Sequence, residues 1–390
     1  MKPAIVTPSR TVLLTLGRLP KGLDLARCLA EAGWRVLVAE PGRRHLCGSS
    51  RAVSQSFQVP APVSKSEAYL EALSRIVQRE NVDLVLPVSE EILHVAALHG
   101  RLDPKVRIGS MPLERLLQVH GKQSFVDLCE RLGLGVPATA RLSDPQAAAL
   151  NRDRPVIVKR EFSCAGVGLE EVSAGAPLPK REAPEQWLVQ QRVEGEELCS
   201  FTVAHEGRAL ATVVYRGTVV SGTVAVCFER IDPSPQVVDW VERFVEGGAL
   251  SGFIGLDLMV DADGGVFGLE CNPRATSGVH FFESQDLAAA LLEPANCHGL
   301  RFRRQRLFQQ FYPCLTETQA SLFRRDHFRQ KLGQLLRAKD VSFQLRDPLP
   351  FLLLPFTAWS ILSRTIFGNM SFGEAATWDI EWTGPTEAVE

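Results

Sequence analysis

The sequence predicts an α/β protein in which a parallel sheet comes first and a mainly antiparallel α+β part follows. Two observations support this. Apolar strand patterns alternate with helical patterns over the first ninety residues, whereas later strand patterns follow one another and end in a hairpin between Ile254 and Asn272. With 390 residues, 45% of them hydrophobic, the chain can build two or three domains with their own cores.

Composition excludes several classes of function. The formal net charge of −2 gives no electrostatic case for binding nucleic acid or an anionic membrane. The nine cysteines show no CxxC or Cys/His ligand spacing, so we expect neither a zinc site nor a disulfide framework, but reduced thiols in the cytoplasm. No apolar run reaches the roughly 20 residues that a membrane span needs.

The N-terminal pattern begins with a strand, Thr11 to Leu16, and a helix, Leu23 to Ala32, that ends at Gly33. A second strand, Trp34 to Ala39, completes a βαβ unit with a parallel sheet. The turn GRLPKG lacks G-x-G-x-x-G, so a dinucleotide site with Glu40 on a ribose is not favoured.

The same alternation continues with a helix over residues 65–80 and a strand over 82–87. Glu90 and Glu91 follow this strand at its carboxyl end, where such sheets bind ligands. Either acid could meet a substrate amine. The commoner role is a solvated acid in the first turn of the next helix.

The hairpin at 254–272 carries the strongest chemical signal. Asp263-Gly264 predicts a two-residue turn, and counting outward from it places Asp257 opposite Glu270, with Asn272 on the same face. Two adjacent carboxylates repel each other, and Mg²⁺ removes that penalty because it binds carboxylates together with phosphate oxygens. Arg274 follows, and its planar guanidinium group can donate two hydrogen bonds to phosphate or carboxylate oxygens. The alternative is an ordinary exposed hairpin with two acids.

At this point the sequence resembles the ATP-grasp ligases. Their closing motif is an Asp on one strand and Glu-x-Asn-Pro-Arg on the next. Asp257, Glu270, Asn272, Pro273 and Arg274 match it position by position. The resemblance implies a small Rossmann-like domain over 1–112, an ATP-grasp domain of two lobes over 113–300 with ATP between them, and a C-terminal extension over 301–390.

Two lysines and a small-residue loop fit the resemblance. A helix is predicted over Leu113 to Leu132, and Lys122 within it has the position of a family lysine that contacts the ATP phosphates. Lys159 lies in the apolar strand Pro155 to Arg160, where a buried lysine needs an anionic partner. The loop that follows resembles the family loop over the triphosphate, through Ser163, Gly166 and Gly168. No G-x-x-x-x-G-K-[ST] occurs, so a P-loop NTPase is not supported.

The strand Trp187 to Val193 resembles the family hinge that binds adenine. The resemblance implies adenine contacts from the backbone near Arg192 and Val193, and a ribose contact from Glu197. Gln190 and Gln191 stand where many relatives have an acid and a lysine, so adenine contacts from these side chains are less expected. Antiparallel strands are predicted over 198–212 and 213–228, with Gly207 in the first turn, and a helix over 235–248.

Four further residues are weaker substrate candidates. Arg216, within the predicted strands, could face the acyl substrate or could be an exposed strand arginine. Ser277 and Gly278 follow the Asn-Pro-Arg and could orient a carboxylate. His280 could act as a general base, although a packed, hydrogen-bonded histidine is commoner.

The last 90 residues match no part of the resemblance. Arg301, Arg303, Arg304 and Arg306 form a basic cluster, and the apolar segment 348–367 contains three prolines that forbid one continuous helix through its first half. We favour a terminal segment that packs on the core or across a homodimer interface. A lid over an apolar substrate is the alternative.

The resemblance implies an ATP-dependent ligase that uses ATP and Mg²⁺, or Mn²⁺, and joins a small-molecule carboxylate to an amine. An acyl phosphate would form with release of ADP, and the amine would then displace phosphate. Arg274 and Lys159 are the catalytic candidates, because transfer between anions needs fixed cations. A catalytically idle ATP-binding regulator and a phosphotransferase without an amine acceptor remain as alternatives.

Overall fold

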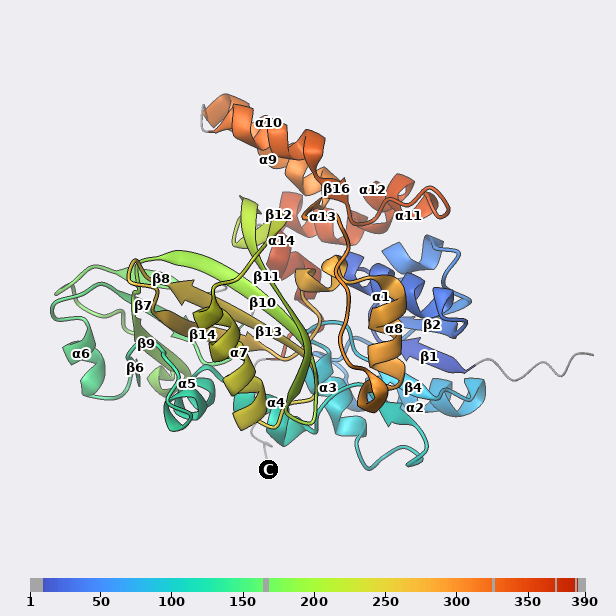
Figure 1. The fold of residues 1–390 in the computed structure, drawn as a ribbon, viewed down its shortest axis with the longest axis horizontal. Coiled ribbons are helices and arrows are strands. Elements are labelled where there is room, and N and C mark those ends of the chain that lie inside the picture. Colours follow the sequence, from blue (N-terminus) through green and yellow to red (C-terminus); the bar gives the residue numbers. More distant parts are fainter. Residues whose placement is uncertain (1–9, 164–167, 325–326, 369, 383, 385–390) are drawn as a thin grey trace, which may run out of the picture.

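The computed structural model describes residues 10–163, 168–324, 327–368, 370–382 and 384. Its first part is a five-stranded parallel sheet with strand order β3-β2-β1-β4-β5, which confirms the predicted βαβ arrangement (Figure 1). The strands are β1 (Thr11–Leu14), β2 (Arg35–Glu40), β3 (Gln55–Gln58), β4 (Leu84–Leu86) and β5 (Arg107–Ile108). The helices of this part are α1 (Pro20–Glu31), α2 (Ser66–Glu80) and α3 (Ile92–Val95), with 3-10 turns Leu46–Ser49 and Ala96–Leu98.

The helix predicted over residues 113–132 is two helices, α4 (Leu113–His120) and α5 (Lys122–Arg131). The single-helix prediction is wrong because the backbone of Gly121, with φ −60° and ψ 127°, leaves the helical conformation. A Cβ at this position would lie 2.9 Å from a carboxylate oxygen of Glu161, so the close approach also favours glycine. The break makes Lys122 the first residue of α5.

A four-stranded antiparallel sheet with the order β6-β9-β7-β8 follows. Its elements are β6 (Thr139–Arg141), α6 (Gln146–Leu150), β7 (Val156–Arg160), β8 (Glu170–Val172), a 3-10 turn Pro184–Gln186, and β9 (Trp187–Gln191). The strands predicted around Lys159 and in the hinge segment are both present in this sheet.

The third sheet has the strand order β14-β13-β10-β11-β12-β15-β16 and is mainly antiparallel. Its first five strands in chain order are β10 (Glu196–His205), β11 (Arg208–Ser221), β12 (Val224–Ile231), β13 (Gly252–Val260) and β14 (Val266–Asn272). The turn at Gly207 is as predicted. The predicted boundary at 212/213 is wrong, because both residues lie inside β11, and the second turn follows Ser221 instead.

Helix α7 (Pro235–Gly247) covers one face of this sheet. Trp240 and Phe244 of α7 stack on each other and pack against Phe125 of α5, with ring centroids 5.4–6.4 Å apart. One apolar cluster therefore holds α5, α7 and the large sheet together. The opposite face of the sheet carries the side chains of Asp257 and Glu270.

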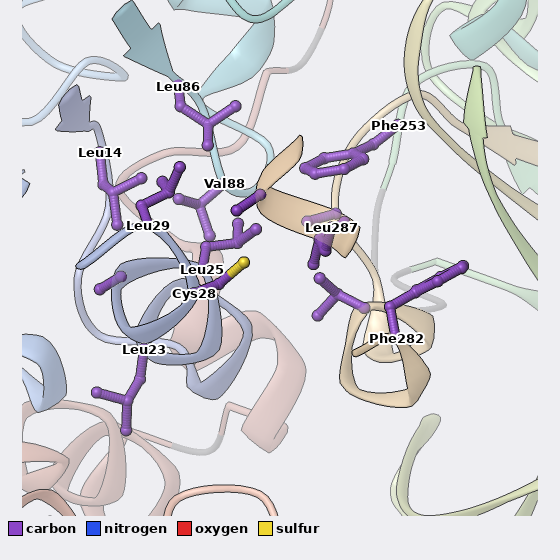
Figure 2. Close-up of a cluster of buried hydrophobic side chains, with 14 of the residues drawn as sticks. Leu14, Leu23, Leu25, Cys28, Leu29, Leu86, Val88, Phe253, Phe282 and Leu287 are labelled. Atoms are coloured by element: carbon purple, nitrogen blue, oxygen red, sulfur yellow. The ribbon is translucent and has the colours of Figure 1, made fainter. Parts of the chain in front are cut away.

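A second apolar cluster joins the parallel sheet to the large sheet. Figure 2 shows Leu25, Cys28 and Leu29 of α1 between Leu14 and Leu86 of the parallel sheet on one side and aromatic residues of the later part on the other. On that later side lie Phe253 of β13, Phe282 and Leu287, the last within α8 (Ser284–Leu292). The shared core fixes the carboxyl edge of the parallel sheet beside the acidic hairpin.

The C-terminal extension completes the large sheet and then returns to the parallel one. It contains β15 (Leu307–Gln309), α9 (Phe311–Arg324), α10 (Phe328–Arg337), β16 (Lys339–Asp340), α11 (Leu349–Leu352), α12 (Leu354–Thr357), α13 (Trp359–Phe367) and α14 (Phe372–Thr377). The apolar segment is broken into short helices, as its prolines predict. Among the described residues, no helix is long and apolar enough to cross a membrane.

Candidate active site

The acidic pair predicted from the hairpin is present. Asp257 of β13 pairs with Glu270 of β14, and Gly255 pairs with Asn272, so all three polar side chains project from one face. The side-chain amide of Asn272 donates to Asp257 Oδ2 at 3.2 Å and to Glu270 Oε1 at 3.4 Å. The amide nitrogen therefore lies between the two carboxylates.

The two acids face each other because of a longer loop and a β-bulge, neither of which the sequence predicted. The loop has three residues between Asp261 and Gly265, whose backbone atoms bond at 3.0 Å, and Gly264 has φ +83°. The predicted two-residue turn is therefore wrong. A β-bulge between Asp257 and Leu258 places Leu269 out of register and restores the pairing of the two acids.

The electrostatics of the pair suit a cation. Burial, and then the adjacent Glu270 carboxylate, raise the pKa of Asp257 to about 8. Burial opposes ionisation of Glu270, but Lys122 and Lys159 outweigh it and lower the pKa of this carboxyl to about 2. The two carboxylates therefore titrate as a coupled pair, in which Asp257 is the harder one to ionise.

Two carboxylates and an amide oxygen are a donor set that Mg²⁺ or Mn²⁺ accepts when phosphate and water oxygens complete its coordination. Within the described residues, no group of three or more His, Cys, Asp or Glu side chains is arranged to hold a metal ion. A cation at Asp257 and Glu270 would therefore depend on Asn272 and on oxygens from a substrate. The two carboxylates fit such a shared site, whereas Asn272 would have to turn its amide over, because its nitrogen faces the acids and its oxygen accepts from Arg274.

Both predicted lysines lie at the acidic pair. The ammonium group of Lys122, at the start of α5, is 3.7 Å from Glu270 Oε2 and donates to the Ser163 carbonyl oxygen at 3.1 Å. Lys159 of β7 donates to Gln190 Oε1 at 2.9 Å and to the Leu269 carbonyl oxygen at 3.2 Å. The bulge therefore turns a backbone carbonyl toward Lys159. Burial lowers the pKa of Lys159 to about 8.

The loop between Ser163 and Gly168 is only partly described. Ser163 lies beside Lys122, and its hydroxyl is 3.4 Å from the ammonium group. Gly168 has φ +73°, and a Cβ there would lie 3.3 Å from the ring of Trp187. The predicted phosphate contact Gly166 lies outside the described residues.

The hinge residues occupy the end of β9, an inner strand of the small sheet, and the start of β10. Gln190 is buried and also donates to Thr139 Oγ1 at 3.0 Å, whereas Gln191 is half-buried. Arg192 is exposed near Glu171 and Glu194, and Val193 is half-buried beside it. Glu197 is exposed on the face of β10 that also carries Cys199, and the thiol of Cys199 donates to Asp257 Oδ1 at 3.2 Å.

Of the weaker substrate candidates, Glu90 lies beside Arg274, whereas Arg216 pairs with other acids. Glu90 is 2% exposed and lies 2.5 Å from Arg274, so it is not the solvated acid that the sequence favoured. Burial opposes its ionisation, but Arg274 and then His120 lower the pKa of Glu90. Arg216 is exposed and pairs with Glu196 and Glu229 at 3.0 and 3.1 Å.

The residues described after Arg274 mainly make packing contacts and hydrogen bonds inside the protein. Gly278 packs against Phe201, and a Cβ there would lie 2.2 Å from the Phe201 Cβ. The half-buried Ser277 precedes it. His280 is buried and its Nδ1 lies 2.9 Å from Asp24 Oδ2, the arrangement of a packed, hydrogen-bonded histidine.

Sequence reasoning missed three residues at the site. His120 directly precedes Gly121 and Lys122, and burial lowers its pKa. Lys21, in the first turn of α1, donates to the Ala275 carbonyl oxygen at 2.7 Å and to Ser89 Oγ at 3.1 Å. Trp382 packs its ring edge-on against Phe162, with centroids 5.0 Å apart. Their neighbours in sequence signalled the first two, whereas nothing local signalled Trp382.

Comparisons with known proteins agree with this geometry. Residues 120–278 match the family model described as the ATP-grasp domain. N5-carboxyaminoimidazole synthetase from Staphylococcus aureus, in complex with ADP, is similar with a TM-score of 0.61 at 12% identity, over 82% of this chain and 86% of that one. L-amino acid ligase from Bacillus licheniformis gives 0.54 at 16% identity, over 73% and 74%.

Pyruvate carboxylase from Rhizobium etli gives a TM-score of 0.56 at 16% identity, over 75% of this chain. The chain spans only 28% of that much longer protein. At such identities the likeness of these three structures concerns the fold, while the family model supplies the assignment within the chain. Residues 120–278 therefore match an ATP-grasp domain.

Proposed function

We propose that the protein is an ATP-dependent ligase that activates a carboxylate as an acyl phosphate, releases ADP and couples the acyl group to an amine. The observation that carries this proposal is the convergence of Lys122, Lys159 and Arg274 on the face that holds Asp257 and Glu270. Phosphoryl transfer to a carboxylate brings two anions together, and fixed cations at the site lower that barrier.

Each group has a proposed part in the chemistry. Lys122 and Lys159 would hold the triphosphate, with Ser163 and Gly168 at the ends of the loop beside it. Asp257, Glu270 and Asn272 would hold Mg²⁺ or Mn²⁺, which when bound neutralises phosphate charge. Lys159 stays buried and close to the acidic pair, where it can also stabilise charge during transfer.

Arg274 is the proposed contact to the carboxylate and then to the acyl phosphate. Its guanidinium already binds a carboxylate, that of Glu90, and its Nη2 donates to Asn272 Oδ1 at 3.0 Å. Attack of the amine nitrogen on the acyl carbon forms the C–N bond, phosphate leaves with the C–O electron pair, and the amine loses a proton. Glu90, ionised beside Arg274, would attract the substrate ammonium group.

The nucleoside would bind at the hinge. The backbone near Arg192 and Val193 would contact adenine, and the exposed carboxylate of Glu197 would contact the ribose hydroxyls. We keep Gln191 as an adenine contact, whereas Gln190 already holds Lys159. Arg216 and His280 take no step in this proposal because their contacts lie elsewhere, and we assign no step to Ser277. The eight cysteines described by the structure are free, which supports a reaction in the reducing cytoplasm.

The test is a panel of acids and amines with release of ADP as the readout. Bicarbonate belongs on the acid side, because one structural neighbour is a carboxylase by name. We expect ADP only when the correct acid and amine are both present, and mass spectrometry should show the amide. AMP and pyrophosphate as products would contradict the proposal. ADP with the acid alone would indicate a phosphotransferase, and nucleotide binding without turnover across the panel would favour a regulator.

A further inference from the structure

The exposed large apolar side chains are concentrated in the C-terminal extension. Of the seventeen in the described part of the chain, fourteen lie between residues 322 and 378. Scattered exposed apolar residues need no explanation, but a concentration of this kind marks an interaction surface. The most exposed within helices α11–α13 and the segment before them are Leu345, Leu352, Phe356, Trp359, Ile366 and Phe367, from 56% to 87%.

These side chains lie on short helices that cannot cross a bilayer. The segment forms α11, α12 and α13, of 4, 4 and 9 residues, with Pro350 and Pro355 in the first turns of α11 and α12. Short helices with exposed Leu, Phe and Trp side chains can lie in the interfacial plane of a membrane, with the apolar side chains inserted and the backbone at the hydrated headgroup level. Trp359 is the residue type most often found at that depth.

The part of the chain that leads up to these helices carries an excess of positive charge. Residues 301–367 contain twelve Arg and Lys against four Asp and Glu, a balance of +8, whereas the remainder of the chain has a balance of −10. The total of −2 conceals this asymmetry, although the acids of residues 368–390 reduce the balance of the whole extension, 301–390, to +3. Arg301, Arg303 and Arg306 pair with acids of the core. The exposed basic residues farther along are Arg324, Arg329, Arg337, Lys339 and Arg346.

Several of the helices that carry these residues lie along one edge of the molecule. In Figure 1 the helices α9, α10, α11 and α12 lie along the edge opposite to α4 and α7. The hairpin of α9 and α10 projects beyond the rest of this edge, and it carries Phe323, 85% exposed, and Leu336, 77% exposed. A flat partner that approaches this edge would meet both the hairpin and the short helices.

The charge identifies the partner. A second copy of the chain would present the same positive face across a two-fold axis, where like charges repel. A lipid bilayer with anionic headgroups offers an apolar interior for the exposed Leu, Phe and Trp side chains and negative charge for the arginines. We propose that the C-terminal extension docks the protein on an anionic phospholipid membrane, without crossing it.

Co-sedimentation of the full chain with vesicles tests this docking, without nucleotide, so that the result is independent of the proposed ligase activity. We expect binding to phosphatidylcholine vesicles with 30% phosphatidylserine at least tenfold tighter than to pure phosphatidylcholine, and weaker as NaCl is raised. Phe356→Ser with Phe367→Ser should lower the affinity at least tenfold. Arg329→Gln with Arg337→Gln should lower the preference for phosphatidylserine roughly fivefold per charge.

Val63→Ser is the matched control, because Val63 is 50% exposed and lies outside the extension, and its binding should equal that of the unaltered chain. All four side chains changed in the extension are exposed, so equal melting temperatures should confirm that the variants fold. Absence of binding to both vesicles, or unchanged binding by the Phe356→Ser, Phe367→Ser variant, overturns the proposal. A dimer that the same variant converts to a monomer also overturns it, since a second copy would then cover this face.

Discussion

The guanidinium of Arg274, which follows β14, lies 2.5 Å from the carboxylate of Glu90, which follows β4 of the parallel sheet. The two residues are separated by more than 180 positions, and the shared core beneath them holds their elements together. The N-terminal sheet thus positions the arginine at the end of the acidic hairpin. The ion pair links two parts of the chain that sequence reasoning treated as separate domains, 1–112 and 113–300.

Replacing Glu90 with Gln should therefore affect both stability and turnover. Loss of one partner from a largely buried ion pair leaves the other charge uncompensated, at a cost of about 3–5 kcal/mol in the free energy of unfolding. We expect ADP release to fall by about 10–100-fold, because Arg274 loses its position. Chemical denaturation and a turnover assay measure the two effects.

The matched control for this pair is Glu229→Gln, which removes the carboxylate from an exposed pair with Arg216. That change should cost less than about 1 kcal/mol, since exposed ion pairs contribute little. If Glu90→Gln behaves like this control in both measurements, Glu90 does not position Arg274.

The pKa of Lys159, lowered by burial to about 8, predicts a pH dependence of nucleotide binding. The side chain is cationic below that pH and neutral above it, so the affinity for ADP should fall as the pH rises through 8. The loss can reach about tenfold per pH unit, and a bound phosphate should move the step to higher pH because it favours the charged form. Calorimetric titration of ADP at several pH values between 7 and 9.5 measures this change in ADP affinity.

Lys159→Met is the control for that step, since it removes the titrating group and should bind ADP weakly without the fall in affinity above pH 8. An ADP affinity that is independent of pH in the unaltered protein, or equal affinity in Lys159→Met, would show that Lys159 does not bind the phosphates.

Asp24 predicts the acid sensitivity of the fold. Burial opposes its ionisation, but Arg303, and then His280, outweigh that and hold the pKa of Asp24 below its ordinary value. Because the pKa is lower in the folded state, the stabilisation is present above the unfolded value of about 3.9 and is lost as the pH falls through and below it. Asp24→Asn should cost about 3–5 kcal/mol at pH 7 and should make the stability less dependent on pH below 4. Denaturant unfolding at pH 3, 4 and 7 tests this, with the exposed turn variant Asp263→Asn expected to match the unaltered protein.

The packing of Trp382 on Phe162 predicts that the C-terminal segment supports the proposed phosphate-binding loop, at its start beside Ser163. Phe162 precedes Ser163, whose carbonyl oxygen accepts from Lys122. An edge-on aromatic pair contributes about 0.5–1.5 kcal/mol, so Trp382→Ala should weaken ATP binding about two- to tenfold. Trp378→Ala, at an exposed ring outside this contact, is the control. Equal losses in the two variants would remove any special role for Trp382.

The sequence predicted the pairing of Asp257 with Glu270 for a reason that is only half right. Alternation of apolar residues fixes which face each side chain takes, and this part of the argument holds. The loop is one residue longer than predicted, which alone would shift the register, and the bulge at Leu269 reverses the shift. Bulges have no strong local sequence signal, so only the structure reveals that the Leu269 carbonyl turns toward Lys159.

Tertiary contacts explain the other differences. The break at Gly121 depends on the approach of Glu161, forty residues away, and so could not be read from the helical pattern of residues 113–132. The return of the C-terminal segment depends on Asp379, which pairs with Arg18 at 2.7 Å across 361 positions. Strand patterns and the acid-Asn-Arg motif are local in sequence, and they could be predicted. The division of the chain at 112/113 and 300/301 stays a prediction.

The central claim is that Asp257 and Glu270 hold a divalent cation beneath the terminal phosphates of a nucleotide. Its most direct test is the binding of Mn²⁺ in the presence of ADP, followed by the electron paramagnetic resonance signal of free Mn²⁺, in the unaltered protein and in Glu270→Gln. We predict that the substitution lowers Mn²⁺ affinity by at least about 100-fold while the melting temperature stays within a few degrees. Equal Mn²⁺ affinity in the two proteins would contradict the account.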